Sequence, residues 1–215
     1  MKKKEFCIAI CLLAMFTCWT LLVCFVDVRA IGPEGSQVGL GLLNGFVHKL
    51  TGTSMLLYQI TDWLGLVPIA TALGFAALGL LQLIKRKSLF KVDFSILSLG
   101  VFYIIIIAFY VLFELVIVNY RPILINGYLE ASYPSSTTML VMFVMPTAIM
   151  QLKARIKNDI LRKIICTVIV AFIAFMVCGR IASGVHWITD IIGGALLSGG
   201  LVMMYRCFAG FVKIK

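Results

Sequence analysis

Six long apolar stretches, separated by short polar segments, dominate the sequence of this 215-residue chain. A run of roughly 20 apolar residues is long enough to cross a bilayer as a helix. We expect spans at about residues 6–26, 62–84, 94–118, 135–151, 164–178 and 187–208. Because 62% of the residues are hydrophobic, the composition excludes a soluble globular domain. The sequence therefore predicts an all-α, six-helix transmembrane bundle that forms a single domain over residues 1–215.

Two segments before the second span need separate interpretation. Met1–Lys4 precedes the first apolar run as in a signal peptide, and residues 28–30 resemble a cleavage site. The run is longer than a typical signal core, so we expect an uncleaved first helix. Apolar side chains in residues 38–50 keep helical spacing, which predicts a short amphipathic helix on the membrane surface. His48 on this helix is expected to be an interfacial residue.

The basic residues predict the orientation of the bundle. Fifteen of the nineteen Lys and Arg residues precede the first span, follow the second and fourth spans, or end the chain. Such residues favour the cytoplasmic side of a plasma membrane protein, which places both termini inside. The net charge of +10 is therefore a topology signal, and we expect the bilayer, not nucleic acid, as the partner. The oligomeric state stays open.

The same topology brings chemically active side chains from three separate segments to the outer face. They are Arg121, Ser135, Ser136, Arg180, His186 and Asp190. Taken singly, each has a structural explanation, such as helix capping for the serines or a buried ion pair for Arg180. If Trp187 opened a helix, His186 and Asp190 would share one face, and Asp190 could orient the imidazole. Their convergence at one membrane level favours a functional site.

This set of residues fits an anion site with a nucleophile. Arginines suit phosphate oxygens, and the start of the fourth span would present free N–H groups to an anion. His186 could attack phosphorus in line and form a phosphohistidine that water resolves. We expect no metal and no other cofactor, because the arginines neutralise the charge. The chain has only two histidines, which excludes a His-rich metal site.

Three blocks of the sequence resemble the type 2 phosphatidic-acid phosphatase superfamily, whose motifs are K-x6-R-P, P-S-G-H and S-R-x5-H-x3-D. The corresponding blocks here are residues 114–122, 134–137 and 179–190. The resemblance covers about the last two thirds of the chain and implies a membrane lipid phosphatase. It implies that Arg121, Ser135, Ser136 and Arg180 bind phosphate, that His186 is the nucleophile, and that Asp190 orients it.

Two departures from the family pattern bear on the chemistry. Glu114 stands where the family has a phosphate-binding Lys, and Thr137 replaces the His that protonates the leaving group. Gly179 in place of Ser is a smaller change. Because the general acid is missing, we expect the protein to prefer a phosphoanhydride such as a polyprenyl diphosphate. Its phosphate leaving group depends less on protonation than the alkoxide of a phosphomonoester does. Alternatively, Glu114, Glu130 or Tyr133 supplies the proton, or Glu114 pairs with Arg121.

Three functions compete on the sequence alone. The leading hypothesis is an outward-facing, metal-independent lipid phosphatase. The second is a catalytically impaired family member that binds or moves a lipid phosphate, which the changes at Glu114 and Thr137 favour. A small transporter is weaker, because the sequence shows no internal repeat of the kind found in many transporters.

Overall fold

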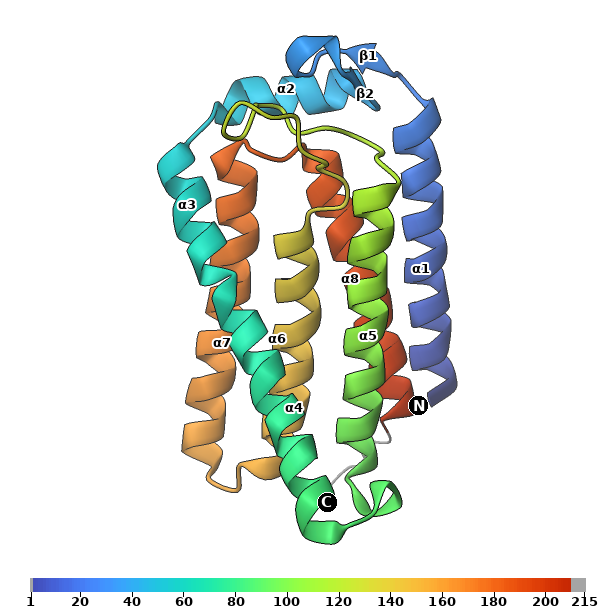
Figure 1. Ribbon diagram of the computed structural model, residues 1–215, viewed down its shortest axis with the longest axis vertical. Coiled ribbons are helices and arrows are strands. Elements are labelled where there is room, and N and C mark those ends of the chain that lie inside the picture. The colour runs from blue at the N-terminus through green and yellow to red at the C-terminus, as the bar shows by residue number, and fades with distance from the viewer. Residues whose placement is uncertain (1, 210–215) are drawn as a thin grey trace.

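The computed structural model describes residues 2–209 and confirms the predicted six-span, all-α class (Figure 1). Six helical segments are long and apolar enough to cross a membrane. They are α1 (Lys2–Phe25), the pair α3 (Met55–Leu64) and α4 (Leu66–Arg86), α5 (Phe94–Leu115), α6 (Ser136–Arg155), α7 (Asp159–Ser183) and α8 (Ile188–Phe208). The chain is therefore a multi-pass membrane protein.

The most buried spans are α6 and α8. Helix α8 packs against α1, α5, α6 and α7, so it is the axis of the bundle. Its glycines allow other segments to approach closely: a Cβ on Gly193 would lie 2.7 Å from the Tyr133 ring, and one on Gly194 would lie 3.0 Å from the Ser135 carbonyl. The segment before α6 therefore sits directly on α8, near the residues that end the α7–α8 connection.

The second span begins earlier than the sequence analysis expects. Its helix starts at Met55, where the Ser54 hydroxyl accepts a hydrogen bond from the Leu57 amide at 3.4 Å. Gly65 keeps helical dihedral angles and joins α3 to α4 in one continuous span. Asp62 thus lies inside the helix and not at its start. This extension carries Tyr58 and Asp62 up to the end of the bundle where α7 finishes, because α3 packs along α7.

A surface helix, α2 (Gly41–Thr51), lies across one end of the bundle, as the apolar spacing predicts (Figure 1). A short antiparallel pair, β1 (Arg29–Ala30) and β2 (Gln37–Val38), precedes it, with a 3-10 turn at Pro33–Gly35 between the strands. Fully buried Asn44 donates hydrogen bonds to the Gly39 carbonyl at 2.8 Å and to the Thr189 hydroxyl at 3.0 Å. The amide thereby fastens α2 to the first turn of α8.

The opposite end of the bundle carries the basic connections. Between α4 and α5 lies a 3-10 turn, Leu89–Lys91, followed by Asp93. The Asp93 carboxylate accepts hydrogen bonds from Arg86 at 2.9 Å and Arg155 at 3.3 Å, which joins the ends of α4 and α6. Lys213 and Lys215, the last basic residues, lie outside the described residues. Helix α2, which we call the roof helix, and the basic loops are therefore at opposite ends of the spans (Figure 1).

Gly184, which ends α7, is a position where the fold tolerates no side chain. Its φ is +62°, and a Cβ there would meet the Gly52 carbonyl oxygen at 1.8 Å. We expect Gly184→Ala to lower the thermal unfolding midpoint in detergent by about 3 °C or more, because left-handed strain costs about 1–2 kcal/mol before the clash is added. Gly100→Ala is the matched control, since nothing lies within 4 Å of its Cβ. Unchanged midpoints in both variants would contradict this packing.

Candidate active site

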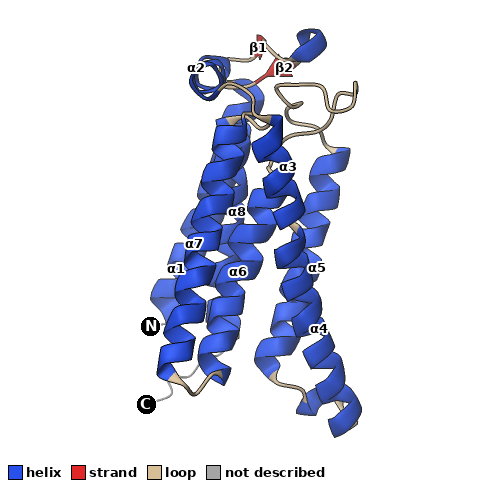
Figure 2. Ribbon diagram, turned by 90° about the vertical axis from the view of Figure 1, so that its left-hand side faces the viewer, coloured by secondary structure: helices blue, strands red, loops and turns tan. Residues whose placement is uncertain are grey.

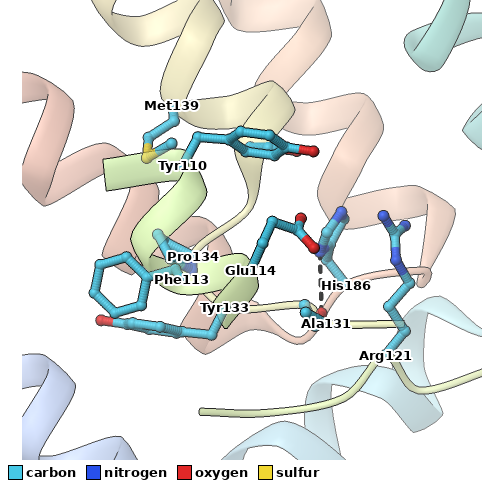
Figure 3. Close-up of a pocket in the computed structure, with 11 residues that line it drawn as sticks. Tyr110, Phe113, Glu114, Arg121, Ala131, Tyr133, Pro134, Met139 and His186 are labelled. Carbon is cyan, nitrogen blue, oxygen red and sulfur yellow. Dashed lines mark hydrogen bonds between the residues drawn. The ribbon is translucent and has the colours of Figure 1, made fainter. Parts of the chain in front are cut away.

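Three segments meet beneath the roof helix: the 116–135 connection, the start of α6 and the α7–α8 connection. Residues of these segments and of α5 line a small cavity (Figure 3). Its lining residues are Tyr110, Phe113, Glu114, Arg121, Ala131, Ser132, Tyr133, Pro134, Ser136, Met139 and His186. The connection folds back on itself through a bridge between Tyr120 and Ala131, and the Ser132 amide donates to the Asn119 carbonyl at 2.9 Å.

A buried hydroxyl links His186 to Asp190. The two side chains do not bond directly, because Nδ1 and Oδ2 are 3.8 Å apart. Ser132 lies between them: its Oγ is 3.1 Å from His186 Nδ1 and donates to Asp190 Oδ2. Since one hydroxyl has one proton, Ser132 must accept from Nδ1, which assigns the proton to Nδ1 and the lone pair to Nε2. His186 therefore has the tautomer in which Nε2 is free to attack.

This arrangement corrects the expectation of a shared helical face. Helix α8 begins at Ile188, and Trp187 is its N-cap with extended dihedral angles. His186 thus lies before the helix, where i and i+4 side chains need not meet. Asp190 instead caps the helix: its Oδ2 accepts from the Trp187 amide at 2.9 Å, and its Oδ1 accepts from Asn119 at 3.4 Å. Its carboxylate is fully buried, so these hydrogen bonds hold it in one place.

Burial governs the protonation of His186, whose side chain is only 2% exposed. Loss of water around the ring lowers the pKa of His186 to about 4, and the positive charges of Arg121 and Arg180 act in the same direction. The carboxylate of Asp190 opposes this shift without overcoming it. The ring is therefore neutral near pH 7, and its Nε2 has no hydrogen-bond partner among residues 2–209.

Arg180 projects into the site from the last turn of α7. Its side chain is 2% exposed, and its Nη2 donates to Asp62 at 2.8 Å and to the hydroxyl of Thr137. Its Nε and Nη1 are buried and lack partners within the described chain. A Cβ on the preceding Gly179 would lie 2.7 Å from the Thr61 side chain. The close contact between α7 and α3 thus explains why glycine suits a position where the family has serine.

Arg121 reaches the same place from the 116–135 connection. Its Nε lies 3.1 Å from Glu130, while its Nη1 is buried with no partner in the described part of the protein. The guanidinium groups of Arg121 and Arg180 both lie over the Tyr58 ring, 5.7 Å and 5.0 Å from its centroid. Two cations beside one aromatic ring repel each other, so an arrangement of this kind favours an anion near them.

The second sequence block divides into residues with different surroundings. Ser135 is fully buried and caps α6, because its Oγ accepts from the amide and the hydroxyl of Thr138. Ser136 lines the cavity beside His186. Thr137 bonds to Arg180 and does not line the cavity. The phosphate-binding roles assigned to the two serines by resemblance stay predictions, with Ser136 the better placed.

The structure separates the three side chains proposed as proton donors. Glu114 lines the cavity with His186, whereas Glu130 does not and pairs with Arg121 instead. The Tyr133 hydroxyl points away from His186 and hydrogen bonds with Thr20 at 2.7 Å (Figure 3). Burial also raises the pKa of Tyr133, which makes its proton harder to release. No ion pair forms between Glu114 and Arg121 among the described residues.

Sequence reasoning missed four residues that complete the site: Tyr58, Asp62, Asn119 and Ser132. Asn119 falls at a variable position of the first sequence block, and the other three belong to segments without a recognisable motif. Each of the four contacts a residue more than fifty positions away. Asp62 offered one signal, as an acidic residue at membrane depth needs a partner. The other three could not be found from spacing along the chain.

The multi-pass bundle thus holds buried Arg180, half-buried Arg121 and the hydrogen-bonded chain His186–Ser132–Asp190 at one end. Residues 118–213 match the model of the PAP2 superfamily, the same superfamily that the sequence motifs resemble. No curated protein shows significant similarity to the chain.

A solved structure has the same fold over nearly the whole length. It is the first transmembrane PAP2 type phosphatidylglycerolphosphate phosphatase from Bacillus subtilis, with a TM-score of 0.65 at 17% sequence identity. The match covers 96% of this chain and 98% of that one. At this identity the likeness establishes the shared fold, and the site chemistry rests on the residues described above.

The tautomer and pKa of His186 can be measured directly, because the chain has only one other histidine, His48. In protein labelled with ¹⁵N-histidine, we expect the His186 ring to remain neutral as the pH falls from 7 to about 5, with the proton on Nδ1. The variant His48→Gln assigns the two signals. A ring that gains its proton near pH 6.5, or carries it on Nε2, would contradict the buried relay.

Proposed function

We propose that the protein is a membrane lipid phosphatase that acts through a phosphohistidine intermediate. One observation carries this proposal: Arg121 Nη1, Arg180 Nε and Nη1, and His186 Nε2 are buried together without partners in the described structure. Buried cations without partners are costly, so a dianionic phosphate that accepts their hydrogen bonds would complete the site. A phosphate held there would stand next to the lone pair of His186.

The proposed chemistry follows from the hydrogen-bonded relay His186–Ser132–Asp190. Nε2 of His186 attacks phosphorus in line, the bond to the leaving oxygen breaks, and the positive charge that develops on the ring is stabilised through Ser132 by Asp190. Arg121 and Arg180 neutralise the equatorial oxygens. Water then attacks the phosphohistidine, which releases inorganic phosphate and restores the neutral ring. The contribution of the protein is positioning and charge stabilisation, and no step needs a metal ion.

An apolar groove supports a lipid substrate over a soluble phosphate. The groove runs between α4, α5 and α6 and is lined almost entirely by apolar side chains such as Ile69, Leu73 and Ile107. Tyr110, Ser136 and Met139 line both this groove and the site cavity. Figure 2 shows α4 and α5 diverging from α6 towards the basic end. A lipid whose phosphate occupies the site can therefore lay its tail along the spans.

The expected orientation places this site at the outer face of the plasma membrane. The basic connections lie at the end of the bundle opposite the site, and positive residues favour the cytoplasmic side. Suitable substrates then carry a phosphate on an apolar tail in the outer leaflet. The similarity to a phosphatidylglycerolphosphate phosphatase supports including that lipid with phosphatidate and polyprenyl diphosphates.

A second candidate is a catalytically impaired relative that binds or moves a lipid phosphate. The observation in its favour is the hydrogen bond between Arg180 and Thr137, which stands where the family has a catalytic histidine. Such a protein would bind the same lipids without releasing phosphate, so turnover distinguishes the two candidates.

His186→Ala should abolish phosphate release by protein purified in detergent. Loss of the nucleophile is expected to lower turnover of the best substrate below about one thousandth of the wild-type value. Release by the wild type should persist in EDTA. His48→Ala is the matched control, and we expect it to keep most of the activity because His48 does not line the phosphate cavity.

Two results would contradict the proposal. Phosphate release by folded His186→Ala at the wild-type rate would exclude His186 as the nucleophile. Binding of these lipids without any phosphate release by the wild type would establish the impaired relative instead.

A further inference from the structure

Thr137 stands where the family has a proton-donating histidine. The surroundings of the nearby side chains indicate which of them can donate that proton instead. Thr137 itself is bonded to Arg180, and Glu130 is paired with Arg121 at 3.1 Å. The hydroxyl of Tyr133 is bonded to Thr20, outside the site. Each of these groups is committed to a structural partner, so none can meet a leaving group without breaking a contact.

Glu114 differs from all three because the side chain that it contacts, Tyr110, itself lines the site cavity. Glu114 lies on the last turn of α5 and is the only carboxylic acid among the described residues that line the site cavity. Figure 3 shows its carboxylate pointing towards His186, and Arg121 lines the same cavity. It makes no ion pair within residues 2–209. A carboxyl group in this position is available to exchange a proton with a bound molecule.

The position of Glu114 also matches the direction from which a lipid tail would enter. Tyr110 precedes it by one helical turn on the same face of α5 and lines both the apolar groove and the site cavity. The leaving oxygen of a lipid phosphate joins phosphorus to the tail, so it must lie on the groove side of the phosphate. Glu114 lines the cavity one helical turn beyond Tyr110, which the groove and the cavity share, so it lies on the side where that oxygen is expected.

We propose that Glu114 is the catalytic acid and base of this site. In the first step, Nε2 of His186 forms a bond to phosphorus while the bond between phosphorus and the leaving oxygen breaks, and the Glu114 carboxyl gives that oxygen its proton. In the second step, the Glu114 carboxylate removes a proton from water as the water oxygen bonds to phosphorus. The phosphorus–nitrogen bond then breaks, phosphate leaves, and Glu114 and His186 return to their starting states. This inference rests on the proposed phosphatase function.

The assignment changes what the missing histidine implies for substrate choice. Loss of the family acid alone predicts a preference for anhydrides, because an alkoxide leaves poorly without a proton. With Glu114 as the donor, the wild type keeps its activity towards phosphomonoesters, and the preference for good leaving groups emerges only when Glu114 is changed. Glu114, in place of the family Lys, thus replaces a phosphate-binding cation with a group that can donate a proton.

The test compares Glu114→Gln with the wild type on substrates that differ in their leaving groups. Gln keeps the size of Glu but has no proton to transfer. The quantity compared is kcat/KM, because it reports only the steps up to the phosphohistidine and not its later hydrolysis. For phosphatidate, whose leaving group is an alkoxide, we expect kcat/KM to fall by about 10² or more, whereas for p-nitrophenyl phosphate it falls by about threefold or less. Glu130→Gln is the matched control: it alters Arg121, which touches every substrate, so its effect should be the same for both.

Each outcome separates this inference from the proposal on which it rests. If Glu114→Gln lowers kcat/KM for both substrates by the same factor while the wild type is active, Glu114 is not the acid, and the phosphatase function stands. If the wild type releases phosphate from neither substrate, the phosphatase function and this inference both fail. A leaving-group effect in Glu130→Gln equal to that in Glu114→Gln would also overturn the assignment.

Discussion

The central constraint on the structure is a pair of guanidinium groups, one buried and one half-buried, whose hydrogen bonds are only partly satisfied. Arg121 and Arg180 both lie over the Tyr58 ring, and buried N–H groups of both lack acceptors in the described chain. Asp62 and Glu130 offset part of the charge from the edges. Leaving these charged N–H groups without acceptors costs free energy, and a bound phosphate would supply the missing acceptors.

The second organising feature is Asp190, whose carboxylate joins the residues of the candidate site to the start of α8. Its carboxylate caps α8, receives Asn119 from the 116–135 connection, and accepts the Ser132 hydroxyl that orients His186. The adjacent Thr189 binds Asn44 of the roof helix. The position of the His186 ring is therefore set by the contacts that dock α2 and the 116–135 connection on α8. Damage to these contacts would displace His186 without removing any residue of the family motifs.

Hydrophobic patterning was sufficient to predict the architecture. The spans, the surface helix and the convergence of three loops follow from apolar run length and from the distribution of basic residues. Helix ends were harder to predict from the sequence. Gly65 continues a helix where glycine often breaks one, and this continuous helix brings Asp62 to Arg180. The relay through Ser132 lay beyond sequence reasoning, because the pairing of residues 132 and 186 arises only when the connection folds onto α8.

The most direct test of the phosphate site is oxygen exchange between water and inorganic phosphate, since it needs no knowledge of the lipid. Phosphate bound by the two arginines should form phosphohistidine at His186 reversibly, releasing one oxygen as water in each cycle. In mass spectra, ¹⁸O-labelled phosphate should therefore lose its label stepwise with the wild type and keep it with His186→Ala. Full retention of the label by wild-type protein shown to bind phosphate would contradict a nucleophilic His186.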